Sequence, residues 1–292
     1  MSAFTIAIVS PGNMGAAIGA RLARHGLRVI SPTGRSAASE TRARNAGIEL
    51  VPEAALANAD YIFSIIPPKE AVTAAERIAR LIAGSKQAPI YIDWNAVSPD
   101  TVQKVAAILD GAGVRFVDGG IIGGPPAGDG PGPVLYASGP HASSIEKLGN
   151  CGIRFKIMDE PIGAASALKM SYAGITKGLT ALGAAMMLAA KRTGCEEALI
   201  AELSVSQPQL LTSFRRAIPD MFSKAERWAP ELREIAHFIG AGQIESGIYN
   251  SIAAFYEGLA ADFNHDKTEV SVLAELMKWG HQNQRWRKPA NG

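Results

Sequence analysis

The N-terminal segment constrains the fold of this chain more than any other. Residues 6–9 form an apolar run that leads into the turn Ser10-Pro11-Gly12-Asn13-Met14-Gly15. A short strand that enters a glycine turn and then a helix typically binds a dinucleotide pyrophosphate, because the helix N-terminus presents N–H groups to the phosphates. Gly12 and Gly15 take the second and third glycine positions of that fingerprint, and Ser10 takes the first. We therefore expect cofactor contacts from Gly12, Asn13, Met14 and Gly15.

The first half of the chain alternates short apolar runs with amphipathic stretches. This alternation predicts a Rossmann-type α/β domain with a doubly wound, mostly parallel sheet and helices on both faces. The expected strands are residues 4–9, 27–30, 61–66, 90–93, 115–117, 134–138 and 153–156, and the expected helices are 14–25, 37–46, 69–83, 99–111 and 142–149. Residues 119–133 are so rich in glycine and proline that we expect an irregular stretch there.

Beyond residue 160 the pattern becomes entirely helical. One helical pattern covers residues 164–192, and further helices are expected at 196–203, 208–213, 228–238, 247–262 and 269–284. We therefore predict a dinucleotide-binding domain over residues 1–160 and an all-α domain over residues 161–292.

Composition narrows the choice of partners. The chain has 292 residues, 47% of them apolar, and a net charge of +2, which favours a folded protein and gives no reason to expect nucleic acid or a membrane as partner. The two cysteines and five histidines show no metal-ligand spacing, so we expect no metal. The first residues lack a basic signal region, and the uncharged run between Lys177 and Lys191 looks too short and too rich in alanine and glycine for a bilayer. We expect a cytoplasmic protein.

The segment after the second strand indicates which dinucleotide binds. An NAD site usually has an acid there for the ribose, but residues 30–36 contain none, and the next acid is Glu40. Arg35 and Ser36 suit a 2′-phosphate, since a guanidinium matches phosphate oxygens with two parallel hydrogen bonds. The sequence thus favours NADP(H) over NAD(H). Arg42 and Arg44 are expected on a solvated helix face.

Two further strand ends should border the cofactor. Ligands of open parallel sheets bind outside the carboxyl ends of the strands, which is where we expect Ile66, Pro67 and Asn95. Asn95 has two equal interpretations: it bonds a carboxamide or a substrate hydroxyl, or it caps the helix that starts near Pro99.

A lone lysine stands out in the helical half. Lys169 has no carboxylate within eight residues on either side, and residues at helical spacing around it are uncharged. Partial burial would lower its pKa toward the range where a neutral amine takes a proton at pH 7. On the residues alone, an ordinary surface lysine remains the alternative.

Several of these motifs resemble the β-hydroxyacid dehydrogenase superfamily, which includes the 6-phosphogluconate dehydrogenases, and its imine reductase relatives. The resemblance covers residues 4–180. The matching segments are Gly12-Asn13-Met14-Gly15, Gly34-Arg35-Ser36, Asp118-Gly119-Gly120-Ile121-Ile122-Gly123-Gly124 and Gly163 through Ala173. The resemblance implies that Lys169 is the general acid/base and that the N–H groups of Gly123 and Gly124 hold a substrate carboxylate. It also implies that the helical domain, residues 161–292, contributes to the substrate site and forms a homodimer.

The chain also departs from that family. Ile122 stands where the family has a serine that binds substrate, and Tyr172 and Ala173 replace two asparagines. Tyr172 is expected to orient the substrate hydroxyl, or else to be a core aromatic. The expected function is an NADP(H)-dependent oxidoreductase acting on the hydroxyl of a hydroxyacid or sugar-acid-like substrate. The alternatives are an imine reductase, against which Lys169 argues because those relatives usually carry Asp or Tyr there, and a non-catalytic NADPH-binding regulatory protein.

Overall fold

The computed structural model describes residues 4–83, 85, 89–240 and 242–278. The chain divides into two compact units, Met1–Ser171 and Tyr172–Gly292, and each is described by itself. A helix was expected over residues 269–284, and its part beyond residue 278 lies outside the described residues.

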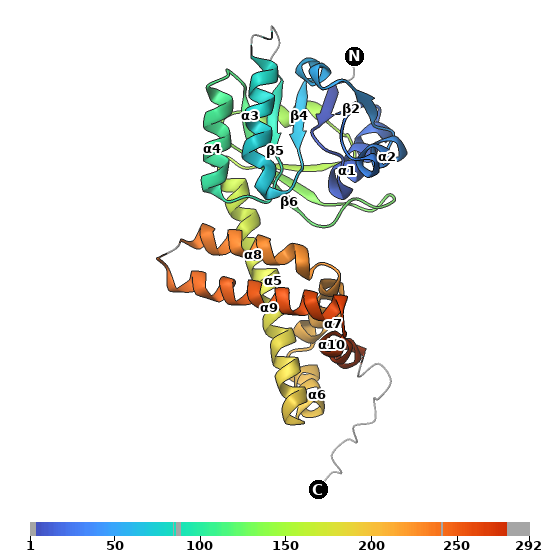
Figure 1. Ribbon diagram of the computed structural model, residues 1–292, viewed down its shortest axis with the longest axis vertical. Coiled ribbons are helices and arrows are strands. Elements are labelled where there is room, and N and C mark those ends of the chain that lie inside the picture. The colour runs from blue at the N-terminus through green and yellow to red at the C-terminus, as the bar shows by residue number, and fades with distance from the viewer. Residues whose placement is uncertain (1–3, 84, 86–88, 241, 279–292) are drawn as a thin grey trace. The chain divides into compact units, whose positions relative to one another are not determined.

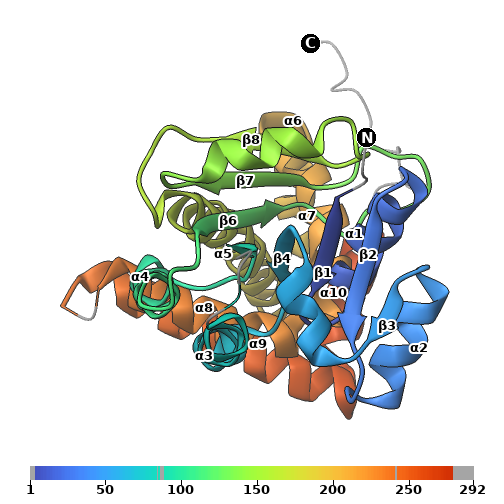
Figure 2. The ribbon, with the colours of Figure 1, turned by 90° about the horizontal axis from the view of Figure 1, so that it is seen from above.

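The first unit is built on one eight-stranded sheet with the order β3-β2-β1-β4-β5-β6-β7-β8. Neighbouring strands are parallel except for β6 and β7, so the expected doubly wound, mostly parallel sheet is confirmed. The strands are β1 (Thr5–Ile8), β2 (Arg28–Pro32), β3 (Glu49–Val51), β4 (Tyr61–Ser64), β5 (Ile90–Asp93), β6 (Phe116–Ile122), β7 (Val134–Ser138) and β8 (Arg154–Ile157). Figure 1 shows part of the sheet, and Figure 2 shows it from above, with β3 and β2 toward one edge and β7 and β8 toward the other.

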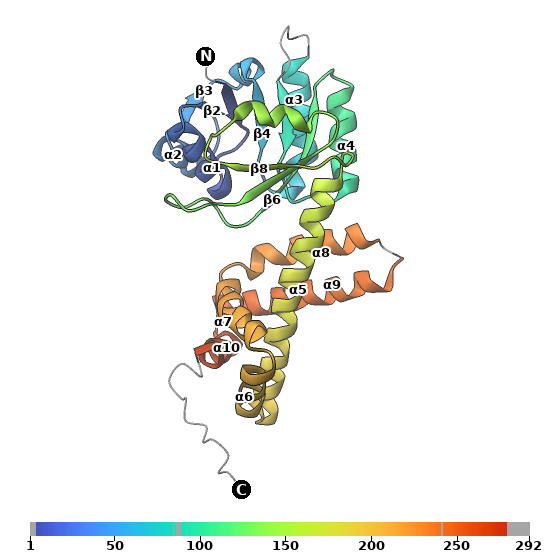
Figure 3. The same cartoon turned by 180° about the vertical axis from the view of Figure 1, so that it is seen from behind.

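Helices cover both faces of this sheet. The helices are α1 (Asn13–Arg24), α2 (Ala37–Asn45), α3 (Ala71–Ile82) and α4 (Pro99–Asp110), and the 3-10 helices are η1 (Glu53–Asn58), η2 (Pro68–Glu70) and η3 (Ala142–Leu148). Because successive strand residues point to opposite faces, Ile62 and Tyr91 pack with α3 and α4, while Phe63 and Ile92 pack with α1, α2 and η3. Helices α3 and α4 lie in front of the sheet in Figure 1. On the opposite face, η3 lies in front of the sheet in Figure 3.

The sequence-based prediction was wrong at part of the glycine-rich stretch. Strand β6 continues through Gly119 and Gly120 to Ile122, and the loop begins only at Gly123. Both glycines serve close packing: a Cβ on Gly119 would lie 2.2 Å from the Trp94 ring, and one on Gly120 would lie 2.6 Å from the Ala165 carbonyl oxygen. Two smaller differences are strand β3, which was not predicted, and residues 142–148, which form a 3-10 helix.

The second unit is helical throughout its described residues, 172–240 and 242–278. Helix α5 (Ala164–Thr193) begins in the first unit and is followed by α6 (Glu196–Ser206), α7 (Pro208–Phe222), α8 (Ala225–Ile239), α9 (Ile244–Asn264) and α10 (Thr268–Lys278). Helix α7 runs well past its predicted end at Ser213 and contains Pro219, a residue that usually interrupts helices.

A half-buried ion pair and a hydrogen bond connect three helices of the second unit. Helices α8 and α9 lie side by side and cross α5 (Figures 1 and 3). Lys177 of α5 pairs with Glu231 of α8 and lies 5.2 Å over the Trp228 ring, and the Tyr256 hydroxyl of α9 donates to the Lys177 carbonyl oxygen at 2.7 Å. Burial lowers the pKa of Lys177, and the Glu231 carboxylate opposes that shift.

Helix α5 is long and apolar enough to cross a membrane by length and composition alone, contrary to our expectation for this segment. However, 50% of its most apolar window is buried inside the protein. A core helix of a globular unit meets the same criterion, so this is weak evidence for a membrane span.

A row of buried polar side chains crosses the sheet of the first unit. The strand register aligns Ser64 of β4, Asp93 of β5, Asp118 of β6 and Ser138 of β7, and all four are at most 1% exposed. Asp93 Oδ1 accepts from the Asn95 N–H at 2.7 Å, while Asp93 Oδ2 has no hydrogen-bond partner among the described residues. Burial raises the pKa of Asp93 to about 7, and the like charge of Asp118 adds to the effect.

This pKa makes the stability of the protein depend on pH. Between the ordinary value of 3.8 and about 7, folded Asp93 binds its proton more tightly than unfolded Asp93 does. The free energy of unfolding therefore falls as pH rises through this window. Asp93→Asn keeps an acceptor for Asn95 but does not titrate. We expect the wild type to lose about 2–3 kcal/mol relative to this variant between pH 5 and pH 8, measured by urea unfolding. Parallel pH curves for the two proteins would contradict the assignment.

Candidate functional site

The glycine turn lies at the carboxyl end of β1. The Gly12 N–H donates to the Ser10 carbonyl oxygen at 2.9 Å, so the turn closes although serine replaces the first glycine. Gly15 fits tightly against this turn, since a Cβ there would lie 3.1 Å from the same oxygen and 3.3 Å from Ile8 Cγ2. The strand and helix α1 thus approach as closely as the dinucleotide fingerprint requires.

Gly12 shows that this turn leaves room for a ligand. Its φ is −66°, and a Cβ placed on it would meet no protein atom within 4 Å. Neither conformation nor packing requires glycine at this position, and the open space beside it fits the close approach of a bound molecule. Helix α1 also has no side-chain cap and no acid in its first turn. These features fit a pyrophosphate group bound at the helix N-terminus. Asn13 is exposed and Met14 half-buried at the same end.

Two arginines reach this turn from the region after β2. Arg35 is half-buried and donates through Nη2 to the Val9 carbonyl oxygen at 3.2 Å. Burial lowers the pKa of Arg35, and the charge of Arg77 lowers it further. Arg42 donates through Nε to the Pro11 carbonyl oxygen at 3.0 Å, so it braces the turn instead of lying on a solvated helix face as predicted.

The other residues after β2 serve helix α2. Ser36 is its N-cap, and its hydroxyl accepts from the Ser39 N–H. The Glu40 carboxylate accepts from the Gly34 N–H at 3.1 Å and pairs with Arg44 at 3.1 Å. The first acid after β2 is therefore already bound by protein groups.

Asn95 connects the ends of β4 and β5. It is 2% exposed, its Nδ2 donates to Ser64 Oγ at 2.9 Å, and its Oδ1 accepts from the Ile66 N–H at 2.7 Å. The expectation that Asn95 caps the next helix was wrong, because Ser98 is the N-cap of α4. Asn95 instead holds the backbone of Ile66, which precedes Pro67, at the carboxyl edge of the sheet.

Asp118 of β6 anchors the start of helix α5. Its Oδ2 accepts from the N–H groups of Gly163 (2.9 Å) and Ser166 (3.1 Å), and its Oδ1 accepts from Ser166 Oγ at 2.6 Å. Ser138 Oγ donates to the same carboxylate at 3.0 Å. A carboxylate that caps the first N–H groups of a helix is stabilised by them and by the helix dipole. Asp118 therefore determines where the helix that carries Lys169 begins.

Strand β6 also holds the lysine itself. Lys169 is half-buried, and its Nζ donates to the Ile121 carbonyl oxygen at 2.5 Å. The absence of a side chain on Gly120 permits this approach, because a Cβ there would lie 3.3 Å from Lys169 Cβ. Strand and helix together direct the ammonium group to the last residues of β6.

The two glycines that are predicted to bind the substrate come directly after β6 in the chain. Gly123 and Gly124 are exposed, and Gly123 has a φ of +120°, a conformation that favours glycine. Tyr172 lies one turn after Lys169 on α5 and is 51% exposed, so it is not the core aromatic of the alternative interpretation. Asp118 belongs to one of the sequence motifs, but its role as a helix cap was not predicted, and neither was the contact of Arg42. The Asp118 role depends on the strand register, which no local pattern reveals.

Comparison with known proteins agrees with this geometry. A family model described as the NAD binding domain of 6-phosphogluconate dehydrogenase matches residues 5–151, and a domain of unknown function matches residues 190–259. An uncharacterised 28.5 kDa protein of Methanothermus fervidus is 26% identical over 209 residues, which cover 70% of this chain and 79% of that protein.

Solved structures share the fold. A 3-hydroxyisobutyrate dehydrogenase of Mycobacterium tuberculosis, solved with L-serine, has a TM-score of 0.73 at 16% identity and covers 94% of this chain and 99% of its own. An imine reductase variant from Myxococcus stipitatus, solved with NAD+, has a TM-score of 0.60 at 16% identity with the same coverage. At such identities these two structures establish the fold alone. The family match over half of the chain shows more: the chain belongs to the 6-phosphogluconate dehydrogenase-like superfamily of NAD(P)-binding oxidoreductases.

Proposed function

We propose that this protein is an NADP(H)-dependent oxidoreductase that acts on the hydroxyl of a hydroxyacid or sugar-acid-like substrate, with Lys169 as general acid/base. The observation that carries the proposal is the position of Lys169, whose Nζ contacts the Ile121 carbonyl oxygen two residues before Gly123. The amine of Lys169 thus lies at the end of β6, and the two N–H groups proposed to bind a carboxylate follow that strand in the chain.

Each proposed residue has a defined task. Lys169 takes the proton of the substrate hydroxyl in oxidation and returns it in reduction, and its contact with Ile121 orients the amine. The N–H groups of Gly123 and Gly124 bind the substrate carboxylate. Tyr172 orients the hydroxyl, and Asn95 offers its remaining amide capacity to a carboxamide or a substrate oxygen. When bound at the glycine turn, the cofactor supplies or accepts the hydride.

Replacement of Lys169 tests this function. We expect Lys169→Ala to lower turnover by about 10²–10⁴-fold, the usual contribution of general acid–base catalysis, without changing the Kd for NADPH. The assay follows nicotinamide absorbance with NADP+ and NAD+ across hydroxyacids, sugar acids and their phosphates. Lys156→Ala is the matched control, since Lys156 is an exposed lysine of β8 in the same unit. Equal turnover in wild type and Lys169→Ala would contradict the assignment of Lys169.

Two alternatives are distinguished when the panel is extended to imines, with NADPH oxidation as the readout. Activity on cyclic imines but on no hydroxyacid would indicate an imine reductase, a fold relative of this chain. Tight NADPH binding without turnover on any substrate would indicate a regulatory protein. The replacements at Ile122, Tyr172 and Ala173 are the sequence features that favour the regulatory protein, whereas Lys169 argues against the imine reductase.

We propose NADP(H) as the preferred cofactor. The support is the pair Arg35 and Arg42, whose guanidinium groups border the glycine turn, together with the engagement of Glu40 by Gly34 and Arg44. A 2′-phosphate would gain charge-assisted hydrogen bonds there, whereas no free carboxylate lies at the start of α2 to bind a ribose diol.

The cofactor preference is tested with Arg35→Ala. We expect the Kd for NADPH to rise about 10- to 100-fold, the loss of one charged hydrogen-bonding group, with little change for NADH. Arg44→Ala, which removes an exposed arginine of the same region, should leave both affinities unchanged. Fluorescence titration measures both constants. An equal loss for NADPH and NADH would show that Arg35 supports the turn through Val9 and does not select the phosphate.

We also propose that the protein is a homodimer through its C-terminal helices. Ile175, Leu179, Leu182 and Met186 of α5 are 47–61% exposed and follow the 4-3-4 spacing of a helix–helix seam. Contiguous apolar surface of this kind usually marks an interaction site.

We further propose that the protein is cytoplasmic, since both of its cysteines are free.

A charge placed in this seam should separate the subunits. We expect the wild type to sediment as a dimer and Leu182→Glu as a monomer, because an unpaired carboxylate would be buried in the interface. Val205→Glu is the control, since Val205 is 81% exposed on α6 outside the seam. A monomeric wild type, or an unaffected Leu182→Glu dimer, would contradict this proposal.

A further inference from the structure

The loop after β6 has little intrinsic reason to be ordered. Residues 123–133 read GGPPAGDGPGP, and most of them are exposed. Glycine loses more conformational entropy on folding than any other residue. The Gly130 N–H donates to the Ala127 carbonyl oxygen at 3.2 Å, which is a weak restraint for a segment of this length. Contacts from outside the loop must therefore determine its conformation.

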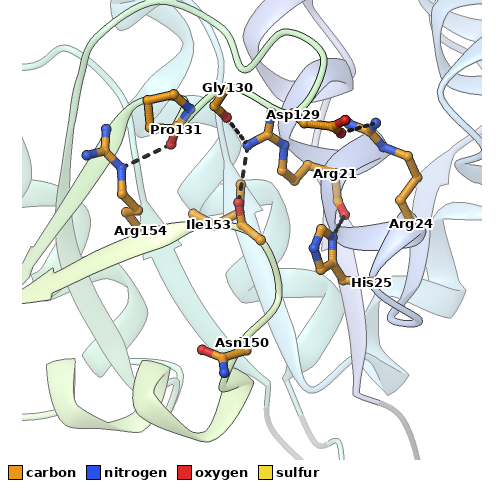
Figure 4. A pocket seen from close by; sticks show the side chains of 10 residues that line it. Arg21, Arg24, His25, Asp129, Gly130, Pro131, Asn150, Ile153 and Arg154 are labelled. Atoms are coloured by element: carbon orange, nitrogen blue, oxygen red, sulfur yellow. Dashed lines mark hydrogen bonds and ion pairs between the residues drawn. The ribbon is translucent and has the colours of Figure 1, made fainter.

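Arg21 of α1 supplies the first of these contacts. It is only 5% exposed, and its guanidinium donates to the Gly128 carbonyl oxygen at 2.7 Å. It also donates to the Gly130 carbonyl oxygen at 2.7 Å (Figure 4). A longer contact of 3.5 Å reaches the Gly152 carbonyl oxygen. A buried guanidinium is costly unless its N–H groups are hydrogen-bonded, so the loop and the arginine stabilise each other.

Arg154 of β8 supplies the second contact from the other side. Its Nε donates to the Pro131 carbonyl oxygen at 3.0 Å and its Nη2 to the Gly132 carbonyl oxygen at 2.5 Å. Each guanidinium thus holds two backbone carbonyls through its planar fork of donors. We call residues 128–132, gripped by Arg21 and Arg154, the clamped segment.

His25 supports Arg21 from the side of α1. A cavity of about 620 Å³ is lined by the C-terminal end of α1, by the loop and by residues 150–154. His25 Nδ1 contacts the Arg21 carbonyl oxygen at 2.8 Å. The His25 ring lies against Gly152, where a Cβ would be 2.3 Å from the ring. Arg24 also lines this cavity, but its ion pair with Asp129 is 3.9 Å long and highly exposed, so it adds little.

Packing inside the loop connects the clamped segment to the substrate glycines. A Cβ on Gly132 would lie 3.1 Å from Pro126 Cβ, and a Cβ on Gly123 would lie 3.0 Å from Pro133 Cα. The two ends of the loop therefore pack against each other. Pro125 and Pro126 have restricted φ angles, so the chain between Gly124 and the clamped segment is stiff. A displacement of the clamped segment must change the backbone at Gly123 and Gly124.

We propose that Arg21 and Arg154 are positioning residues for the substrate: they clamp residues 128–132 and thereby keep the N–H groups of Gly123 and Gly124 in the arrangement that receives a carboxylate. This inference rests on the proposed function, in which these N–H groups bind the substrate. It assigns a role in substrate affinity to two side chains that do not themselves touch the substrate.

Variants of Arg154 test the clamp, since Arg154 is exposed and its replacement leaves the buried Arg21 in place. We expect Arg154→Ala to raise KM for the carboxylate substrate about tenfold or more, the loss of two hydrogen bonds from a charged group, while kcat stays within about twofold. The Kd for NADPH should not change. Arg154→Lys should recover only part of the effect, because an ammonium group lacks the planar fork that reaches two carbonyls. Arg24→Ala, the control from the same cavity, should behave as wild type.

Amide hydrogen exchange of the same variants provides a readout that does not need activity. Residues 123–132 should exchange faster in Arg154→Ala than in Arg24→Ala, with protection elsewhere unchanged. Unchanged exchange and KM in Arg154→Ala would overturn the clamp while the Lys169→Ala result still stands. A joint loss of kcat, NADPH binding and Tm would also overturn it, because that pattern indicates general destabilisation. If the wild type turns over no substrate, the proposed function fails, and the exchange experiment decides the clamp separately.

Discussion

The candidate site depends on one hydrogen-bonded contact, the capping of helix α5 by the carboxylate of Asp118. Four donors from Ser138, Gly163 and Ser166 meet that carboxylate inside the protein. A buried carboxylate is costly without such donors, and the first turn of a helix has unpaired N–H groups that need an acceptor. Each therefore satisfies the other. Because strand β6 carries the acceptor, the start of the helix is tied to the strand, and the placement of Lys169 follows.

Strand β6 consequently organises the site along its length. Gly120 lets the helix approach, the Ile121 carbonyl receives the Lys169 amine, and Gly123 begins the loop that is proposed to bind the substrate. On the adjacent strand β5, the ionised form of Asp93 is disfavoured, since burial and the nearby charge of Asp118 both raise its pKa. Such a concentration of buried polar groups at the carboxyl edge of a parallel sheet is typical of ligand sites in this architecture.

The cofactor side is built on a different principle. There the protein places backbone N–H groups and arginines around open space, and Gly12 has no packing role of its own. Arg35 and Arg42 both donate to carbonyls of the strand and turn, so the same guanidinium groups that brace the turn would face a bound phosphate. The family match to the NAD binding domain of 6-phosphogluconate dehydrogenase is consistent with this use of the first unit.

The sequence by itself determined the doubly wound sheet, the helical second half and the glycine turn, because hydrophobic periodicity and turn chemistry act between residues close in the chain. The prediction of an irregular stretch was wrong at Gly119 and Gly120. Glycine indicates a turn locally, but here it permits Trp94 and α5 to pack closely against β6. It also left the role of Asn95 open. Only the tertiary structure decided that Asn95 binds Ile66, that Asp118 caps α5, and that Arg21 and Arg154 hold one loop. These contacts join residues 22 to 109 positions apart or strands aligned by register, and no local pattern encodes such distances.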